Sequence, residues 1–328
     1  MKQIILSTLF CALLSVIFGY VFIPVLKSLK LGQPILKYVT SHKTKSGTPT
    51  MGGIIFIIPL VITFLIFSSG DKRLSIFVLA VTVAFMTVGF LDDFLKIRLK
   101  RNEGLTPLQK ICFQVAISII ASIVAYKSGQ TFLNIPFTKK TLNIGIFTII
   151  LNVLVFVASV NAVNLTDGLD GLCASVSSVN LLYFSALIYL QVTAFKGIYV
   201  NESEYFNLSL FCLNLVAGLL GYLLFNTQRA SVFMGDTGSL ALGGAISGVS
   251  VITGNALHVI FIGVFYLLSA LSVIIQVAVY KRMKKRVFLM APLHHHFQEK
   301  GYSEGKITYA YSFITFLIGL CLILVYFW

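Results

Sequence analysis

Long apolar segments alternate with short polar ones along the whole chain. Ten apolar runs recur, over approximately residues 4–26, 52–69, 74–91, 111–126, 144–160, 172–194, 206–225, 240–254, 257–280 and 307–327. A helix needs about 20 apolar residues to cross the hydrocarbon core of a bilayer, which is about 30 Å thick. The pattern therefore predicts an all-α integral membrane protein with about ten transmembrane helices.

The composition and the spacing of the runs indicate a single domain. Hydrophobic residues make up 57% of the 328 residues and charged residues 11%, whereas ordinary globular domains carry about 25% charged residues. No polar segment between the runs is long enough to bury a core of its own. We therefore predict one polytopic transmembrane domain over residues 1–328. Its first run lacks a small-residue cleavage site and is expected to be an uncleaved span.

The basic residues predict the orientation. Eighteen lysines and arginines lie in segments that follow odd-numbered spans, and six lie in segments that follow even-numbered spans. Because cytoplasmic loops are enriched in basic residues, we expect the odd-numbered loops in the cytoplasm and both termini in the periplasm or outside the cell. The net charge of +14 then serves topology and contact with anionic membrane lipids. Nucleic acid is not an expected partner.

The cysteines suggest no particular chemistry. They are Cys11, Cys112, Cys173, Cys212 and Cys321, all in or at the edge of apolar runs, and none belongs to a CxxC pair. We interpret them as small buried hydrophobic residues rather than as disulfides or metal ligands.

Acidic residues concentrate in three short segments beside the runs. Five of the eleven lie there: Asp92, Asp93, Asp167, Asp170 and Asp236. A charged side chain at the centre of a bilayer costs about 2.5 to 3.5 kcal/mol on insertion scales. Carboxylates at membrane depth are therefore candidates for a functional site. The predicted topology places all five on the cytoplasmic face.

Asp92 and Asp93 are adjacent at the end of the third run, in GFLDDFLK, with Lys96 following. Adjacent side chains on a helix point in different directions, so one can meet a metal or phosphate while the other orients a proton or a lysine. A hydrated helix end is the alternative, although a helix C-terminus disfavours acidic side chains.

The segment NAVNLTDGLDG places polar residues at every third position, from Asn161 through Asn164 and Asp167 to Asp170. On a helix these side chains would form a stripe that can hydrogen-bond a nucleotide. The Asp-Gly pairs could instead mark a turn. The segment lacks the ligand spacing and the distal glutamate of an EF-hand calcium loop, which excludes that assignment.

Two further segments are rich in glycine. Asp236 lies in FMGDTGS, where glycines let a backbone approach phosphate oxygens. The segment SHKTKSGTPTMGG, residues 41–53, combines hydroxyls and lysines in front of a span and could hold an anion there. Each has a simpler alternative, because Asp236 could cap the next helix and residues 41–53 could form a turn before a capped helix.

Three consecutive histidines follow a basic cluster, in MAPLHHHF. Their side chains diverge, so one zinc ion bound by all three is not expected. One or two imidazoles are better suited to donate hydrogen bonds to phosphate or to transfer protons. Together the cytoplasmic loops hold the carboxylates, lysines, imidazoles and glycines that Mg²⁺-assisted phosphoryl transfer to or from a lipid requires.

The segments SHKTKSGTPTMGG, GFLDDFLK, NAVNLTDGLDG, VFMGDTGSL and MAPLHHHFQ occur in this order within the ten-span chain. In this combination the sequence resembles, essentially from end to end, the phospho-N-acetylmuramoyl-pentapeptide transferases of bacterial peptidoglycan synthesis. The resemblance implies transfer of phospho-MurNAc-pentapeptide from UDP-MurNAc-pentapeptide to undecaprenyl phosphate, with Mg²⁺ as cofactor, giving lipid I and UMP. It also implies a homodimer in the bacterial inner or plasma membrane.

The resemblance further implies roles for individual residues. Asp236 resembles the Mg²⁺ ligand of the family and one of its catalytic residues, and Asp92 and Asp93 match its catalytic pair. His294 would join them as a catalytic residue that contacts phosphate. Residues expected around the substrates and the nucleotide are Lys45, Thr50, Lys96, Lys110, Asn164, Asp167, Asp170, Asn226, Phe233 and His295. Of these, Phe233 offers a face for stacking on uracil.

Other interpretations remain open. A sibling enzyme that uses UDP-N-acetylglucosamine would share the fold and the metal chemistry. A secondary transporter would place its acids near the bilayer midplane in broken helices, whereas these acids cluster at one face. A non-catalytic membrane scaffold leaves the five motifs unexplained. The motifs also leave open whether the lipid phosphate attacks directly or an aspartate first forms a covalent intermediate, although direct attack is simpler.

Overall fold

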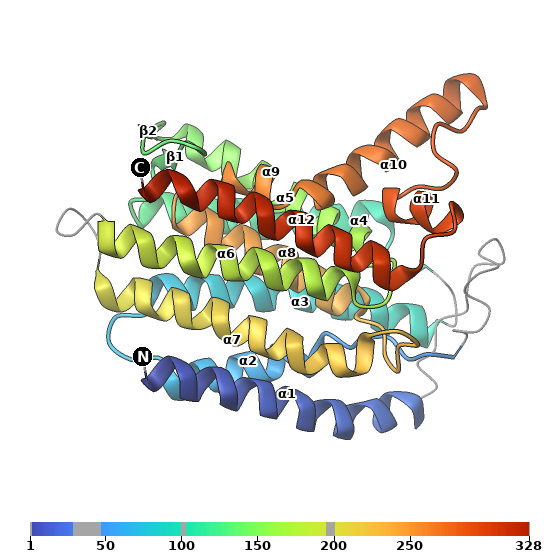
Figure 1. The fold of residues 1–328 in the computed structure, drawn as a ribbon, viewed down its shortest axis with the longest axis horizontal. Coiled ribbons are helices and arrows are strands. Elements are labelled where there is room, and N and C mark those ends of the chain that lie inside the picture. The colour runs from blue at the N-terminus through green and yellow to red at the C-terminus, as the bar shows by residue number, and fades with distance from the viewer. Residues whose placement is uncertain (1, 29–46, 100–102, 195–200, 328) are drawn as a thin grey trace.

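The computed structural model describes residues 2–28, 47–99, 103–194 and 201–327, and most of these belong to helices that run side by side (Figure 1). In chain order the elements are α1 Lys2–Ser28, α2 Ile54–Phe67, α3 Arg73–Arg98, α4 Pro107–Lys127, β1 Phe132–Asn134, β2 Thr141–Asn143, α5 Phe147–Thr166, α6 Leu172–Ala194, α7 Glu202–Asn226, α8 Gly235–Ile252, α9 His258–Ile262, α10 Val264–Met283, α11 Leu293–Glu299, α12 Glu304–Leu324 and a 3₁₀ turn, η2 Val325–Phe327. The strands form one antiparallel hairpin in which Leu133 lies opposite Leu142. The structure is therefore mainly helical, as predicted.

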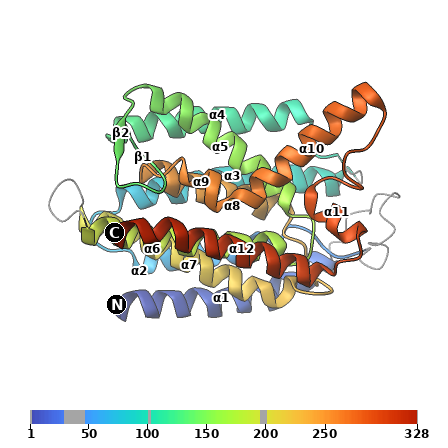
Figure 2. The same ribbon diagram turned by 45° about the horizontal axis from the view of Figure 1, so that its top comes forward.

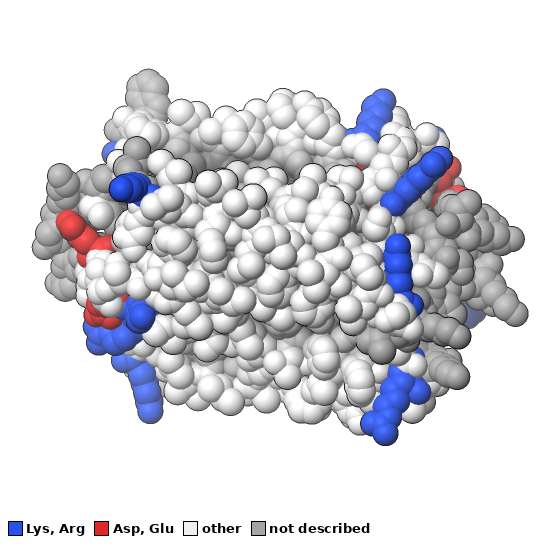
Figure 3. All heavy atoms as spheres, turned by 90° about the horizontal axis from the view of Figure 1, so that it is seen from below, with Lys and Arg blue, Asp and Glu red and all other residues white. Residues whose placement is uncertain are grey.

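Eight helices of the described chain are long and apolar enough to cross a membrane: α1, α3, α4, α5, α6, α7, α10 and α12. Figure 3 shows a broad belt without Lys, Arg, Asp or Glu between two ends that carry them. Both observations support a multi-pass membrane protein. The number of ten spans stays a prediction, because α2 has only 14 residues and α8 is rich in glycine and serine.

The apolar run over residues 257–280 is divided into two helices, whereas the sequence suggested one. The division lies at Gly263, between α9 and α10. A Cβ atom at this position would lie 2.5 Å from the carbonyl oxygen of Val259. The close turn therefore depends on the missing side chain of glycine.

Both chain ends lie at the same end of the bundle, and α11 lies at the other end (Figure 1). An even number of crossings produces this arrangement, in agreement with the expectation that the termini share one side. The assignment of that side to the periplasm or exterior stays a prediction.

The start of α4 carries a clear sequence signal. The Thr106 hydroxyl accepts a hydrogen bond from the backbone N–H of Gln109 (3.3 Å), and the Gln109 side chain accepts one from the backbone N–H of Thr106 (3.0 Å). This reciprocal pair is a capping box, which satisfies two donors at a helix start. It places Lys110 near the start of α4.

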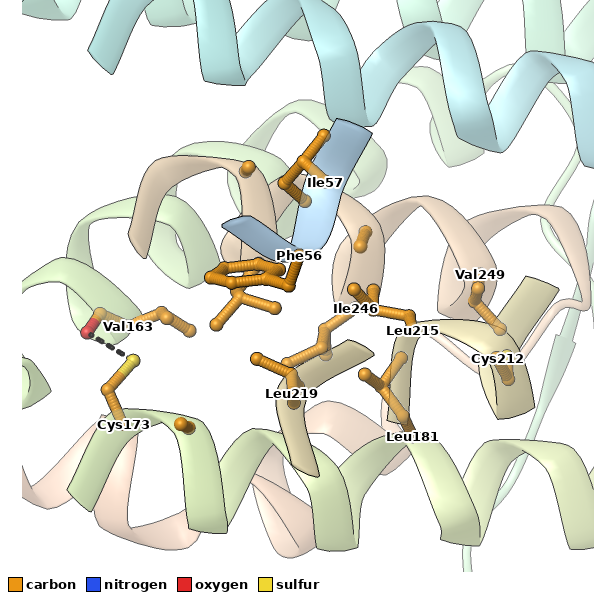
Figure 4. Packing of buried hydrophobic residues seen from close by; sticks show 14 of the residues in the cluster. Phe56, Ile57, Val163, Cys173, Leu181, Cys212, Leu215, Leu219, Ile246 and Val249 are labelled. Atoms are coloured by element: carbon orange, nitrogen blue, oxygen red, sulfur yellow. Dashed lines mark hydrogen bonds between the residues drawn. The ribbon is translucent and has the colours of Figure 1, made fainter. Parts of the chain in front are cut away.

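Helix α8 lies inside the bundle, where it packs against α2, α3, α5 and α6 (Figure 2). Its residues from Thr237 to Ile252 are all buried. Small residues allow the close contacts, since a Cβ atom on Gly243 would lie 2.5 Å from Cα of Val160 in α5. Apolar side chains from several helices fill the space around it (Figure 4).

The interpretation of the cysteines was only partly right. Cys11, Cys173 and Cys212 are buried, and the Cys173 thiol donates to the carbonyl oxygen of Val163 at 3.8 Å (Figure 4). Cys112 and Cys321 are exposed instead, because they lie on the outer surface of α4 and α12. All five are free thiols.

Candidate active site

Asp92 and Asp93 lie within α3, which continues beyond them to Arg98. Their exposed fractions are 3% and 0%, so the alternative of a hydrated helix end is wrong. Asp92 Oδ1 accepts a hydrogen bond from the backbone N–H of Leu105 at 2.9 Å. Asp93 Oδ2 accepts bonds from the backbone N–H and the hydroxyl of Thr237 at 2.9 and 2.7 Å. The two neighbours therefore point to different partners, as their adjacency predicted.

Asp236 lies in the first turn of α8, and Met234 occupies the N-cap position. The alternative that Asp236 serves as the cap is therefore wrong. A Cβ atom on Gly89 of α3 would overlap the carbonyl oxygen of Asp236. Gly235 has a φ of +71°, which favours glycine and turns the chain into α8. These two glycines bring Asp236 beside the acidic pair of α3.

The three carboxylates form one cluster. One ligand oxygen from each of Asp92, Asp93 and Asp236 lies within 4.8 Å of the other two. Oδ1 of Asp93 is buried and accepts no hydrogen bond within the described part of the chain. Hard divalent cations such as Mg²⁺ take carboxylate oxygens as ligands. The donor set therefore fits such an ion.

Two lysines from different helices enter this cluster. Lys96 Nζ lies 2.6 Å from Asp92 Oδ2 and 3.0 Å from Asp236 Oδ2. Lys110 Nζ lies 2.7 Å from the same oxygen of Asp236. When all five groups are ionised, one negative charge is uncompensated. Such a site can receive a cation together with an anionic substrate.

The expected polar stripe is helical only in its first half. Helix α5 ends at Thr166, so Asn161 and Asn164 lie on the helix, whereas Asp167 and Asp170 lie in the turn that follows. Asn164 Nδ2 donates to Oδ1 of Asp236 at 2.7 Å. Asn164 is therefore joined to the carboxylate cluster.

A pocket of about 280 Å³ opens beside the cluster. It is lined by Thr50, Lys96, Asn164, Asp167, Gly168, Leu169, Asp170, Asn226, Phe233, Gly235 and Asp236. Most residues expected around the substrates thus surround one cavity. The exceptions are Lys110 and His295, which do not line it, and Lys45, which lies outside the described residues.

The side chains of Asp167 and Thr50 can form hydrogen bonds to a ligand in the pocket. Desolvation, and after it the charges of Asp236, Asp93 and Asp170, raise the pKa of Asp167 to about 8. This carboxyl group can therefore be protonated near neutral pH and donate a hydrogen bond. The buried hydroxyl of Thr50 has no hydrogen-bond partner among the residues described.

Asn226 lines the pocket, but both ends of its amide bind the protein itself. Its Oδ1 accepts from the backbone N–H of Gly171 at 3.0 Å, and its Nδ2 donates to the carbonyl oxygen of Val232 at 2.8 Å. The side chain therefore ties the turn after α5 to the segment before α8. It shapes the pocket wall through these two bonds.

The predicted divergence of the three histidines of α11 holds only for His296, whose ring contacts Phe288. The rings of His294 and His295 lie against each other, with centroids 4.3 Å apart, and Nε2 of both lies beside Gly168. His294 is fully buried against Gly168 of the pocket wall. Burial, and after it His295, hold the pKa of His294 well below its ordinary value, so the imidazole is neutral. Neither of its ring nitrogens has a hydrogen-bond partner in the described structure. His296 Nδ1 accepts a backbone bond from the preceding loop and is structural.

Three residues of the site were not singled out from the sequence. Thr237 holds Asp93, and the hydroxyl of Ser239 accepts a bond from Asn164 at 2.8 Å. Both residues could have been found from the sequence, because their hydroxyls belong to the segment GDTGS around Asp236. Glu304 had no comparable signal, although its Oε2 accepts from the backbone N–H of the pocket residue Asp170 at 3.1 Å. That contact joins segments far apart in the chain.

Known proteins resemble this chain over nearly its whole length. The sequence model of glycosyl transferase family 4 matches residues 75–254. The model of phospho-N-acetylmuramoyl-pentapeptide-transferase signature 1 matches residues 45–57. The phospho-N-acetylmuramoyl-pentapeptide-transferase of Clostridium perfringens strain SM101 is 43% identical over 95% of this chain and 94% of its own length. The enzyme of Clostridium botulinum strain Alaska E43 is 43% identical over 98% of this chain and 97% of its own length. That of Thermoanaerobacter sp. strain X514 is 44% identical over 97% of this chain and 96% of its own length.

These likenesses confirm the family that the five motifs indicated. The relatives cover 95 to 98% of the chain, and the family matches include the segment before α2 as well as α3, α5 and α8, which carry the site. The chain is therefore an enzyme that belongs to the phospho-N-acetylmuramoyl-pentapeptide-transferase family.

Proposed function

We propose that this enzyme transfers phospho-MurNAc-pentapeptide from UDP-MurNAc-pentapeptide to undecaprenyl phosphate, giving lipid I and UMP. One P–O bond forms between a lipid phosphate oxygen and the phosphorus attached to the sugar. The bond between that phosphorus and the departing UMP breaks. The observation that carries the proposal is the cluster of three carboxylates and two lysines beside a polar pocket. The names of the relatives agree with it.

The positive groups of the site suit a diphosphate. Lys96 and Lys110 are held in place by Asp236, and ammonium groups in such positions stabilise negative charge that develops on a leaving phosphate. On the pocket wall, the unpartnered hydroxyl of Thr50 and the ring of Phe233 offer contacts to the nucleotide. We assign the hydrogen bond to Thr50 and the stacking on uracil to Phe233.

We expect Mg²⁺ to be the cofactor, with Asp236 as its ligand and Asp93 Oδ1 available as a second oxygen, because among the described residues it accepts no hydrogen bond and has only Lys96 Nζ near it, at 3.7 Å. When bound, the ion would neutralise charge on the diphosphate. The chain itself holds the ligand oxygens in place, because Thr237 fixes Asp93 and Asn164 fixes Asp236. Supporting bonds of this kind orient metal ligands before the metal binds.

We favour direct attack by the lipid phosphate over a covalent aspartyl intermediate. Asp92 and Asp93 are buried, and each already accepts hydrogen bonds that lower its reactivity as a nucleophile. The apolar belt suits the bacterial inner or plasma membrane. The family resemblance extends to a homodimer, which the mass of the detergent-solubilised protein, measured by light scattering, would test.

The first test is release of UMP by the detergent-purified enzyme. With undecaprenyl phosphate and Mg²⁺ present, we expect release from UDP-MurNAc-pentapeptide and not from UDP-N-acetylglucosamine, and EDTA should abolish it because the diphosphate charge is then uncompensated. Omission of the lipid should also abolish release if attack is direct. Release only from the simpler sugar would assign the chain to the sibling activity. No release from either donor by folded protein would contradict the proposal.

Replacement of Thr237 by valine is expected to lower turnover by about 10- to 100-fold, because a hydrogen bond to a charged group contributes about 1.5 to 3 kcal/mol. The change removes the hydroxyl donor to Asp93 and leaves the backbone N–H donor in place. Steady-state UMP release measures the effect, and Thr237→Ser should restore activity. The control is Thr87→Val on the exposed side of α3, where the hydroxyl donates to the carbonyl oxygen of Val83 in its own helix. Equal activities of the two valine variants would refute the role of Thr237.

A further inference from the structure

Two cavities adjoin at the end of the bundle opposite to the active site. A polar pocket of about 330 Å³ lies among the N-terminal ends of α3 and α7 and the C-terminal end of α4. An apolar groove of about 460 Å³ runs between α3 and α4. Arg73 lines both cavities. The pocket and the groove therefore meet at this side chain.

The polar pocket carries charges of both signs. Arg73 forms ion pairs with Asp71 at 2.7 Å and with Glu204 at 3.4 Å. Glu204 is buried, with an exposed fraction of 8%, so one shared guanidinium is its counter-charge. Lys127 also lines the pocket, and within the described part of the chain no carboxylate lies within 4 Å of its ammonium group. A buried carboxylate and the exposed ammonium group of Lys127, which has no carboxylate near it among the described residues, thus share one cavity.

The groove has the chemistry and the length for an acyl chain. Its walls are apolar and include Ile76 to Ala84 on α3 and Ile117 to Val124 on α4. The stretch on α3 rises by about 12 Å along the helix axis. One leaflet contributes about 15 Å to a hydrocarbon core of about 30 Å. The groove therefore extends through most of one leaflet.

We propose that the two cavities together bind one glycerophospholipid with a zwitterionic amine headgroup, of the phosphatidylethanolamine type, in the leaflet opposite to the active site. Its phosphate would contact Lys127 and Arg73, its ammonium group would contact Glu204, and one acyl chain would occupy the groove. The mixed charges favour this headgroup over an anionic one, since a headgroup without a cation leaves the buried carboxylate of Glu204 with a counter-charge that it shares with Asp71. This inference does not depend on the proposed reaction.

The test uses the full-length enzyme, delipidated in detergent and titrated with lipids of identical acyl chains in native mass spectrometry. We expect phosphatidylethanolamine to bind more tightly than phosphatidylglycerol. Lys127→Glu should weaken its binding about fivefold or more, the effect of losing a contact of about 1 kcal/mol. Ala80→Trp, in the wall of the groove, should weaken it by filling the space for the acyl chain. Lys140→Glu, on the exposed hairpin outside both cavities, is the matched control.

Three results would overturn the proposal. Equal binding of both lipids with no effect of either variant would mean that only bulk lipid surrounds this face. Tighter binding of phosphatidylglycerol would mean that the carboxylate plays no part in headgroup recognition. Loss of self-association in Ala80→Trp with unchanged lipid binding would identify the groove as a contact between copies of the chain. Because the two substitutions act on different cavities, misfolding of one variant still leaves the other as a test.

Discussion

Replacement of Asp236 by asparagine is expected to lower turnover by about 10²- to 10³-fold, a typical loss when one fixed electrostatic group is removed from an active site. Both lysines of the site contact the same oxygen of Asp236. An asparagine there removes the charge that holds them, and it also removes the charged ligand proposed for Mg²⁺. The measurement is UMP release over a range of Mg²⁺ concentrations, and high Mg²⁺ should not restore the wild-type rate.

The control for this experiment is Cys321→Ala. Cys321 is an exposed thiol on α12, outside the pocket and the carboxylate cluster, so its loss should leave turnover unchanged. Both variants should elute as folded protein in size-exclusion chromatography. If Asp236→Asn and Cys321→Ala had the same activity, the assignment of the active site would be wrong.

Replacement of Gly89 by alanine is the second change with a large expected effect, a loss of activity of about 10²-fold. The added Cβ atom would overlap the backbone carbonyl of Asp236, and a backbone atom cannot rotate away as a side chain can. Helices α3 and α8 must then separate at the point where their carboxylates meet. A displacement of about 1 Å in an active site can lower the rate about 10²-fold, whereas overpacking costs about 1 to 3 kcal/mol of stability.

The measurements are steady-state UMP release and thermal unfolding in detergent. Gly305→Ala provides the matched control, because an added Cβ atom at Gly305 in α12 meets no atom within 4 Å. We expect Gly305→Ala to retain activity, while Gly89→Ala should lose far more activity than its change in melting temperature would explain. Full activity of Gly89→Ala would contradict the close contact between α3 and α8.

Much of the active site could be predicted because short polar segments that connect helices on one side of a bundle must lie close together. The spans bring the ends of α3, α5 and α8 to one side, and there Asp92, Asp93, Asn164 and Asp236 meet. The acidic character of these segments was visible against the apolar background. Their convergence therefore followed from the alternation of spans and loops.

Other features depended on contacts that hydropathy does not contain. Helix α5 ends at Thr166, and the turn after it is held by Asn226 through a bond to Gly171. The bond of Glu304 to Asp170 likewise joins residues 134 positions apart. Such features arise from long-range hydrogen bonds, so the Asp-Gly pairs could suggest a turn as one alternative but could not show where the helix gives way to it or which residues hold it.

The burial of α8 has a consequence for how the protein is made. This helix contains five glycines, three serines and Asp236 within 18 residues, and it is not among the helices of the described chain that are apolar enough to cross a membrane alone. Insertion machinery selects segments by their apolarity, so α8 needs neighbours that bury its polar groups. Helices α2, α3, α5 and α6, against which it packs, precede it in the chain, whereas α9, which also contacts it, follows it. Synthesis therefore completes most of the receptor for α8 before α8 itself leaves the ribosome.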